Sequence, residues 1–364
     1  MKDIIKTISD LVAIPSQGGI DKPHAIIDYL AEQSKMFGCT PKIIRYHQKQ
    51  VGLAIEIIYD VEQPMYVLEA VIDTAPVGDL SARHSNPFIP TIKDGWMYGR
   101  GTADSKAGAA IFLSLIEHIK NCRKNVIIFF DADEHTGKFL GAKALVKAYP
   151  KIAGVFSAYP GNEKLIIGSR GFYRAIARIS GTSEHSGSRN TTPDNPITTA
   201  CKFIESLQLD TTKSSYPLPP KLSVTAIYGG EYFSMIPSII NVNIDIRTTT
   251  DFTATDAEQF LLERATKFDE KIRIEKFESF PAYILDENTY IRNVFEKSLK
   301  QSGFNIPSQV SGSSNIGNLL AKYEIPMIAG FGVNYKNAHA ANECIDLTSI
   351  EPVRKVYENL INNI

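Results

Sequence analysis

The sequence contains few cysteines, and they lie far apart. Four cysteines occur among 364 residues, at positions 39, 122, 201 and 344, and no two of them form a C-x-x-C pair. This spacing argues against a thiolate zinc site and against a disulfide framework. A reducing compartment fits such a chain best, so we expect a cytoplasmic protein.

An excess of charge of one sign is also missing. Lysine and arginine total 39, aspartate and glutamate total 40, and no block of like charge interrupts the chain. No apolar run approaches the roughly 18 residues that a membrane-spanning helix requires. The amino-terminal stretch up to Pro15 has charges within its apolar stripe and so lacks the core of a signal peptide. We therefore expect a partner that is a small molecule or another protein, and neither nucleic acid nor a membrane.

What the sequence does contain is enough apolar residues, 43%, for two ordinary domains. The first 170 or so residues alternate short apolar runs with helical patterns. Strands are expected at 51–58, 65–72, 125–130 and 154–157, and helices at 22–37, 106–120 and 138–148. This alternation is typical of an α/β domain, a sheet flanked by helices.

From Phe172 the pattern changes. The expected order is strand 172–180, helix 193–208, strands 222–228 and 239–247, helix 254–268 and strand 271–277. This β-α-β-β-α-β order is that of the split ferredoxin-like unit, an α+β domain. Beyond about residue 285 a long helical pattern leads to another apolar strand near Pro326, so the chain is expected to return to the first domain.

Ionisable residues follow the apolar strands of the first domain. They are Asp73, Asp104, Asp131, Asp133, Glu134, His135 and His339. Ligands of open α/β sheets bind beyond the carboxyl ends of the strands. Carboxylates and imidazoles gathered there would repel each other or stay unpaired without a cation, and mixed oxygen and nitrogen ligands suit zinc.

Each of these residues alone also has a structural interpretation. Asp104 can cap a helix, Asp73 can form a turn, and His339 can be an ordinary loop histidine. The adjacent pair Glu134-His135 says more, because a turn needs only one polar residue there and Gly137 permits close approach to a ligand.

A set of motifs runs in order through nearly the whole chain. They are Asp73-Thr-Ala-Pro-Val-Gly-Asp, Pro87-Phe, Asp94-Gly-Trp-Met-Tyr-Gly-Arg-Gly-Thr-Ala-Asp-Ser-Lys, Asp133-Glu-His-Thr-Gly, Arg170-Gly-Phe, Gly181-Thr-Ser-Glu-His-Ser, Gly229-Gly, Asp245-Ile-Arg and Ala338-His-Ala-Ala-Asn-Glu. Together they resemble the zinc metallopeptidase family of acetylornithine deacetylase, succinyl-diaminopimelate desuccinylase, aminoacylase and glutamate carboxypeptidase.

The resemblance implies a catalytic metal-binding domain with a mixed sheet, interrupted by a ferredoxin-like lid. Residues 1–171 and 285–364 would form the catalytic domain and residues 172–284 the lid. Members of the family are commonly homodimers through the lid, so a homodimer is expected here.

The resemblance also implies a ligand set. In the family two zinc ions share one bridging aspartate, which matches Asp104. The two ligands private to the first ion fall on Val71 and Tyr159, which are poor or impossible ligands, whereas those of the second ion match His135 and His339. We therefore predict a mononuclear site with one zinc per chain, with cobalt or manganese as possible substitutes. Two alternatives stay open: Glu163 or Asp133 replaces a missing ligand, or the match at Tyr159 is shifted.

The remaining site residues are assigned through the same resemblance. Glu134 matches the general base, and His185 matches a histidine that reaches into the partner subunit's site and stabilises the oxyanion. Arg247 matches a clamp for a substrate carboxylate, although an ion pair with Asp245 is the other interpretation. Ser234 stands near the position of a substrate-contacting asparagine. Asp73 matches the catalytic aspartate, whose usual role is to orient the histidine that this chain lacks.

The sequence thus predicts a zinc hydrolase that cleaves the amide bond of an N-acyl amino acid or short peptide with a free carboxylate. The alternative is a catalytically inactive homologue that retains the cleft as a small-molecule binding module or serves as a dimeric scaffold. Val71 and Tyr159 favour the alternative. The intact residues Asp104, Glu134, His135, His185 and His339 favour the enzyme.

Overall fold

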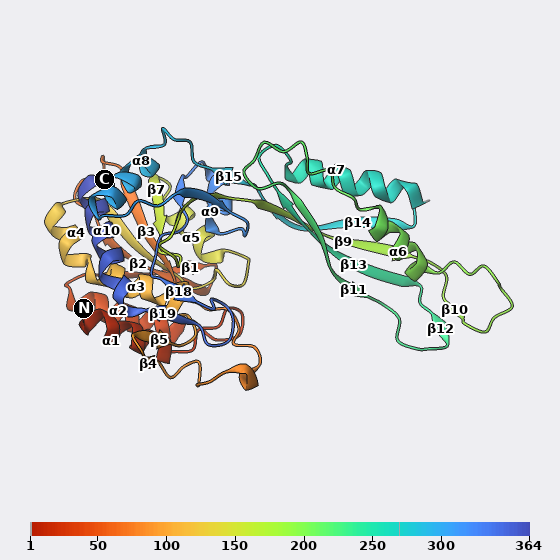
Figure 1. Ribbon diagram of the computed structural model, residues 1–364, viewed down its shortest axis with the longest axis horizontal. Coiled ribbons are helices and arrows are strands. Elements are labelled where there is room, and N and C mark those ends of the chain that lie inside the picture. Colours follow the sequence, from red (N-terminus) through yellow and green to blue (C-terminus); the bar gives the residue numbers. More distant parts are fainter. Residues whose placement is uncertain (1, 269) are drawn as a thin grey trace. The chain divides into compact units, whose positions relative to one another are not determined.

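The computed structural model describes residues 2–268 and 270–364 (Figure 1). The chain divides into two compact units. The first consists of Met1–Gly168, Ile284–Gln309 and Asn315–Ile364, and the second of Ser169–Tyr283 with Val310–Ser314. The first unit is thus built from both ends of the chain.

A six-stranded mixed sheet forms the centre of the first unit. Its order is β1 (Pro41–Tyr46), β2 (Lys49–Ile57), β6 (Val126–Asp131), β3 (Met65–Val71), β7 (Ile152–Ser157) and β17 (Met327–Ile328). Strands β6, β3, β7 and β17 are parallel, whereas β1 and β2 run antiparallel to their neighbours. Every residue of β6 is buried, as expected for a parallel strand covered on both faces.

Helices flank this sheet (Figure 1). They are α1 (Lys2–Ala13), α2 (His24–Met36), α3 (Ala107–Ser114), α4 (Ile116–Cys122), α5 (Leu140–Ala148), α8 (Tyr290–Gln301), α9 (Ile316–Leu320) and α10 (Ile350–Asn363), with short 3₁₀ turns η1 (Leu80–Ala82), η4 (Ala321–Tyr323) and η5 (Leu347–Ser349). Small residues let α3 approach closely: a Cβ on Gly108 would lie 2.4 Å from the Cβ of Ala158. The Phe112 and Tyr357 rings pack edge to face at 4.8 Å and join α3 to α10.

Shorter strands form two further sheets. A second antiparallel sheet has the order β18 (Tyr335–Lys336), β19 (Cys344–Asp346), β5 (Trp96–Tyr98) and β4 (Thr91–Lys93). Three further strands, β8 (Leu165–Ser169), β15 (Tyr283–Ile284) and β16 (Ser308–Ser311), lie where the chain passes from one unit to the other.

The second unit has the ferredoxin-like order expected from the sequence. It runs β9 (Gly171–Ser180), α6 (Pro196–Ser206), β11 (Lys221–Tyr228), β13 (Ile239–Thr248), α7 (Ala254–Ala265) and β14 (Ile272–Phe280). A separate two-stranded antiparallel sheet pairs β10 (Glu184–His185) with β12 (Met235–Ile236). The sheet order is β11-β13-β9-β14, and all neighbours are antiparallel. Burial alternates along β13, whose apolar face packs in the same core as α6 and α7. The α/β class with an α+β insertion is thereby confirmed.

Several elements differ from the expectation. Strand β1 was not expected because only one of its six residues is fully buried, so its apolar pattern is weak. The helix expected at 254–268 ends at Ala265 and continues as the short 3₁₀ turn η3 (Thr266–Phe268). The segment Val310–Ser314 belongs to the second unit. Within the described residues, no helix is long and apolar enough to cross a membrane.

Candidate metal centre

Three side chains from distant parts of the sequence meet in the first unit. Asp104 lies in the irregular turn η2 (Thr102–Lys106) that precedes α3, His135 follows β6, and His339 lies between β18 and β19. His339 Nε2 is 2.8 Å from Asp104 Oδ2 and 3.2 Å from His135 Nε2, and His135 Nε2 is 3.7 Å from Asp104 Oδ2. One ligand atom of each residue lies within 4.8 Å of the others. The structure therefore brings the predicted ligands of the second ion together.

The donor atoms of this cluster suit a divalent cation. Asp104 is buried, and its second oxygen Oδ1 has no hydrogen-bond partner among the described residues. Burial alone would raise the pKa of Asp104, but hydrogen bonds from the two histidines hold it well below its usual range. Burial would lower the pKa of His135, yet its contacts with Asp104 and Asp73 raise it to about 11. One carboxylate and two imidazoles gathered at this spacing could hold a divalent metal ion.

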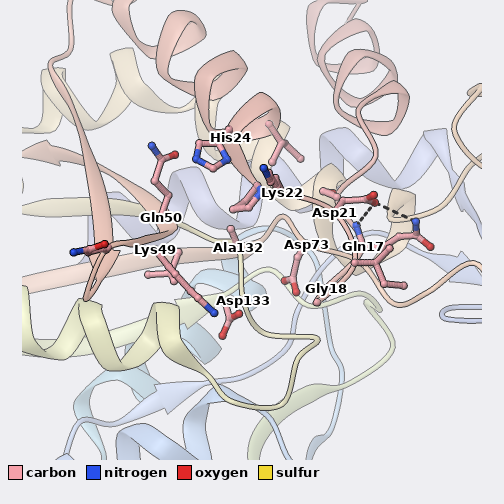
Figure 2. Close-up of a pocket in the computed structure, with 17 residues that line it drawn as sticks. Gln17, Gly18, Asp21, Lys22, His24, Lys49, Gln50, Asp73, Ala132 and Asp133 are labelled. Atoms are coloured by element: carbon pink, nitrogen blue, oxygen red, sulfur yellow. Dashed lines mark hydrogen bonds between the residues drawn. The ribbon is translucent and has the colours of Figure 1, made fainter.

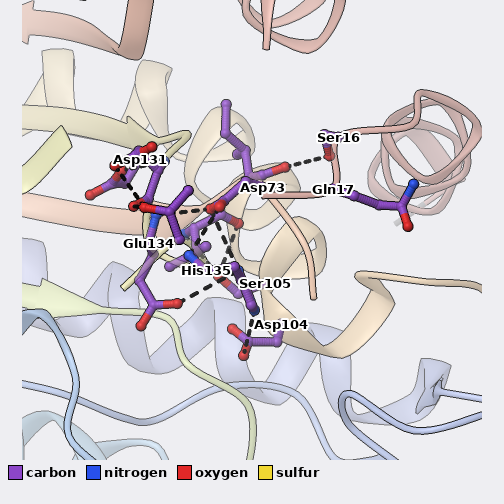
Figure 3. A network of polar contacts seen from close by, with 12 residues as sticks. Ser16, Gln17, Asp73, Asp104, Ser105, Asp131, Glu134 and His135 are labelled. Atoms are coloured by element: carbon purple, nitrogen blue, oxygen red, sulfur yellow. Dashed lines mark hydrogen bonds and ion pairs between the residues drawn. The ribbon is translucent and has the colours of Figure 1, made fainter. Parts of the chain in front are cut away.

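Asp73 holds the main chain that carries two of the site residues (Figure 3). Its carboxylate accepts hydrogen bonds from the N–H groups of Glu134 at 3.1 Å and His135 at 3.0 Å. Gly18 packs against this carboxylate, since a Cβ there would lie 2.7 Å from Asp73 Oδ2. The family resemblance left Asp73 without its usual histidine, and the geometry gives it a contact with the Glu134-His135 pair instead.

Glu134 lies beside His135 and carries a nearly buried carboxyl group. Its side chain is 14% exposed, and Oε2 is 3.6 Å from His135 Nδ1. Burial raises the pKa of Glu134 to about 7. The Tyr159 hydroxyl donates a hydrogen bond to Glu134 Oε1 at 3.1 Å. A carboxyl group with a pKa near neutrality is suited to accept and return a proton.

Arg100 and Glu343 hold the main chain of the metal-binding residues in place, and the sequence did not single them out. Their side chains form an ion pair of 2.6 Å and are each 1% exposed. Arg100 also donates to the carbonyl of His339, a residue with a positive φ of 62°, and Glu343 accepts from the N–H of Ala103 and Asp104. Both residues lie inside the quoted motifs, so the signal was present. A buried arginine and glutamate become recognisable as a pair only when the fold joins them.

Among the described residues, none on the side of Val71 belongs to the cluster that can hold a metal. Val71 is fully buried, and its main-chain N–H and C=O both bond to the Ser105 hydroxyl. Among the described residues, the cluster that can hold a metal contains neither Asp133 nor Glu163. Asp133 Oδ2 instead accepts hydrogen bonds from the Thr136 hydroxyl and the Leu140 N–H, and Glu163 is exposed.

The remaining predicted site residues lie in the second unit. His185 is exposed on β10, and its Nδ1 accepts the Gly187 N–H. Ser234 is exposed, and its carbonyl accepts the Ser186 N–H. Arg247 forms an ion pair with Asp245 at 2.8 Å and donates to the Ser314 hydroxyl. The ion pair that the sequence left as one interpretation of Arg247 is thus present.

The chain is similar in sequence and in fold to several known proteins. Succinyl-diaminopimelate desuccinylase from Sulfurovum sp. (strain NBC37-1) is 24% identical over 310 residues, 82% of each chain. A tripeptidase from Staphylococcus aureus is 20% identical, with a TM-score of 0.80 over 99% of this chain and 97% of its own. A dinuclear metal-binding peptidase from Bacillus subtilis is 15% identical, with a TM-score of 0.72 over 99% of this chain and 97% of its own.

A family model covers most of the chain, including every residue of the metal cluster. The model of peptidase family M20/M25/M40 matches residues 67–363. This match, together with the Asp104, His135 and His339 cluster, makes the protein a metal-dependent hydrolase of amide bonds. The chain belongs to peptidase family M20/M25/M40.

Proposed function

We propose that this protein is a zinc-dependent deacylase or exopeptidase that uses one metal ion per chain. Its substrate is an N-acyl amino acid or a short peptide with a free carboxylate. One observation carries the proposal: the ligand atoms of Asp104, His135 and His339 lie within 4.8 Å of one another, and Glu134 is the next residue to His135. Cobalt and manganese are expected to substitute for zinc, because they accept the same oxygen and nitrogen ligands.

The proposal of a single ion is supported by the two positions that lack ligands. Val71 carries no donor atom, and Tyr159 is a phenol whose pKa is raised well above its usual value by burial. The Tyr159 hydroxyl already has Glu134 as its partner. A neutral phenol engaged in this way is a poor substitute for the carboxylate that the family resemblance expects there.

The residues around the cluster divide the chemical work. Zinc bound at this centre supplies Lewis acidity toward the amide carbonyl. Glu134 takes a proton from the attacking water and passes it to the leaving amine. The hydrogen bond from Tyr159 orients the Glu134 carboxylate, and Asp73 fixes the main chain of Glu134 and His135.

In this proposal the second unit serves as a lid and as the dimer contact. His185 stabilises the oxyanion in the partner's site, and Ser234 contacts the substrate. Arg247 binds the substrate carboxylate through its guanidinium fork, which requires that the carboxylate replace Asp245 as its partner. The exposed side chains Tyr228 and Phe233 favour a homodimer through this unit, because each is an apolar group left in solvent. Four free cysteines suit a cytoplasmic protein.

Metal analysis combined with a substrate panel tests the proposal. The purified chain is loaded with zinc, dialysed and analysed for metal content, and is then assayed on acetyl, succinyl and dipeptide substrates with zinc, cobalt or manganese. We expect one tightly bound ion per chain and metal-dependent turnover of at least one substrate. Two tight ions would overturn the mononuclear site. Binding of the panel compounds without turnover would favour the alternative, an inactive binding module.

A further inference from the structure

A cluster that contains a thiol lies where α4 and α10 pack side by side in the first unit (Figure 1). His118 and Cys122 stand four residues apart on one face of α4, and Asn362 is close to the end of α10. None of the three belongs to the metal centre, and none lines the pocket drawn in Figure 2. The cluster is therefore a separate feature of this unit.

The three side chains bring one potential ligand atom each to a common point. Cys122 Sγ is 3.4 Å from His118 Nε2 and 3.1 Å from Asn362 Oδ1. The nitrogen and the oxygen are 3.0 Å apart. An ion seated just above this triangle reaches all three atoms at ordinary metal–ligand lengths, about 2.0–2.1 Å to nitrogen and about 2.3 Å to sulfur. The spacing therefore fits a metal ion held on three sides.

The cluster holds few protons for so many close contacts. His118 Nδ1 faces the carboxylate of Glu358 at 3.6 Å, which draws the ring proton to Nδ1 and leaves a lone pair on Nε2. The Asn362 oxygen is an acceptor as well, so the Cys122 thiol supplies the single proton for three atoms. Two acceptors in contact repel each other unless a cation lies between them. This arrangement of lone pairs favours a metal ion.

Glu358 occupies the place expected behind a metal-bound imidazole. A histidine that binds a metal usually donates its second ring N–H to a carboxylate, which fixes the ring and makes the other nitrogen a stronger ligand. Glu358 is itself held by Lys355 at 3.0 Å. The side chains of His118 and Glu358 are 26% and 20% exposed, so an ion can enter from solvent.

The chemistry of the Cys122 thiol fits an exchangeable ion. Burial raises the pKa of this thiol, Glu358 adds to the shift, and Lys124 opposes it. Without a metal the side chain therefore stays a thiol. When a metal binds, a sulfur–metal bond replaces the S–H bond and the proton passes to the buffer. Thiolate and imidazole ligands together select zinc and similar ions over magnesium and calcium.

We propose that His118, Cys122 and Asn362 form a second metal site, which takes zinc or cobalt and joins α4 to α10. Water occupies the remaining position on the ion. The site is partly exposed and one of its ligands is a neutral amide, so it holds its ion less tightly than the metal centre, and dialysis empties it. The single tightly bound ion of the proposed function is therefore unaffected.

An optical titration of the full chain with Co²⁺ tests the proposal, after the metal centre has been filled with zinc and the excess removed by dialysis. Cobalt bound to a thiolate absorbs in the near ultraviolet through sulfur-to-metal charge transfer, and the ligands of the metal centre contain no sulfur. We expect this band to saturate at one Co²⁺ per chain and to be absent in Cys122→Ser. The matched control is Cys201→Ser, at an exposed cysteine of α6, which should keep the band.

Two further variants distinguish a coordinated ion from one that binds a thiol alone. Glu358→Gln keeps all three ligands and is expected to raise the Kd for Co²⁺ by about tenfold, because outer carboxylates contribute about 10- to 100-fold to metal affinity. His118→Gln removes a ligand and should raise the Kd further. The Tm of each metal-free variant, compared with that of the wild type, reports whether the fold is intact.

Three results would overturn the proposal. They are the absence of the charge-transfer band in the wild type, a band that survives in Cys122→Ser, and a Kd that stays unchanged in both His118→Gln and Glu358→Gln. The band reports sulfur alone and no turnover is measured, so any of these failures leaves the proposed hydrolase activity untouched. Conversely, failure of the metal centre to retain zinc would not alter the sulfur-to-cobalt band.

Discussion

The two sides of the metal centre differ in what they offer a cation. On one side, Asp104, His135 and His339 present donor atoms to a common point and rest on buried partners, the Arg100–Glu343 pair and Asp73. On the other side, Val71 and Tyr159 stand at the two positions where the family resemblance expects ligands. Val71 is apolar, and the Tyr159 hydroxyl is engaged in a hydrogen bond to Glu134.

The difference shows that the charge of a buried carboxyl group depends on whether a positively charged partner lies beside it. On the side of Val71, Glu69 lies on the same face of β3 and is fully buried, with a hydrogen bond from the Ser157 hydroxyl. Burial raises the pKa of Glu69 to about 8, so the group is largely neutral at pH 7. A buried acid without a cation stays protonated, whereas Asp104, which has two histidine partners, stays charged.

The largest expected effect is the loss of activity in Glu134→Gln, on the side of the site that has its ligands. The amide cannot accept a proton, so kcat is expected to fall by about 10²- to 10⁴-fold, the usual contribution of a general base. Metal content, measured by elemental analysis, should stay at the wild-type value because Glu134 is not among the ligands.

Glu163→Gln is the matched control for that variant. It makes the same chemical change at an exposed glutamate outside the cluster, and both activity and metal content should be unchanged. Loss of metal in Glu163→Gln would revive the alternative in which this residue substitutes for a missing ligand. Full activity in Glu134→Gln would remove it from the role of base.

The next prediction restores ligands at Val71 and Tyr159 and measures the number of bound metal ions. In Val71→His/Tyr159→Glu, an imidazole and a carboxylate occupy the two positions, and we expect the metal content to rise from one to two ions per chain. Each single variant serves as a control and should remain at one ion, because one new ligand with Asp104 is too few for a tight site. A double variant that folds, as judged by Tm, and still holds one ion would contradict the role assigned to these positions.

The smallest expected effect is the contribution of Glu69 to the pH dependence of the free energy of unfolding. Its pKa is about 8 in the folded chain, above its unfolded value of 4.5, so the folded state binds the extra proton between these pH values. The free energy of unfolding should therefore fall as pH rises through this window. Glu69→Gln should remove that loss, so that between pH 5 and pH 8 the wild type should lose on the order of 3 kcal/mol more of its free energy of unfolding than the variant.

Urea denaturation at a series of pH values measures this effect. The exposed carboxyl of Glu62 provides the control, since Glu62→Gln should leave the pH dependence of the wild type in place. Parallel curves for wild type and Glu69→Gln would mean that Glu69 is charged in the folded protein and has a partner that the geometry does not provide.

Much of the fold was predictable because its signals are local. The apolar run that forms β6 and the small residues that open α3 act within one element, and the order of elements after Phe172 is enough to indicate the ferredoxin-like unit. Strand β1 was missed because an exposed edge strand carries a weak apolar pattern.

The candidate site was predictable in part for a different reason. Asp104, His135 and His339 stand in motifs, so the sequence indicates that they are candidate metal ligands. The residues that hold them in place cannot be identified in the same way. Nothing in the sequence states that Arg100 pairs with Glu343, 243 positions away, or that Tyr159 bonds to Glu134.

The amino-acid sequence by itself determined the classes of element, their order, and which residue types are available at the ends of the strands. Hydrophobic periodicity and turn chemistry act over a few residues, and so they can be read from the chain. Only the tertiary structure decided that three of those side chains share one point and that Asp73 holds the Glu134-His135 main chain. Distances between residues far apart in sequence depend on how the elements pack, and packing is a property of the whole unit.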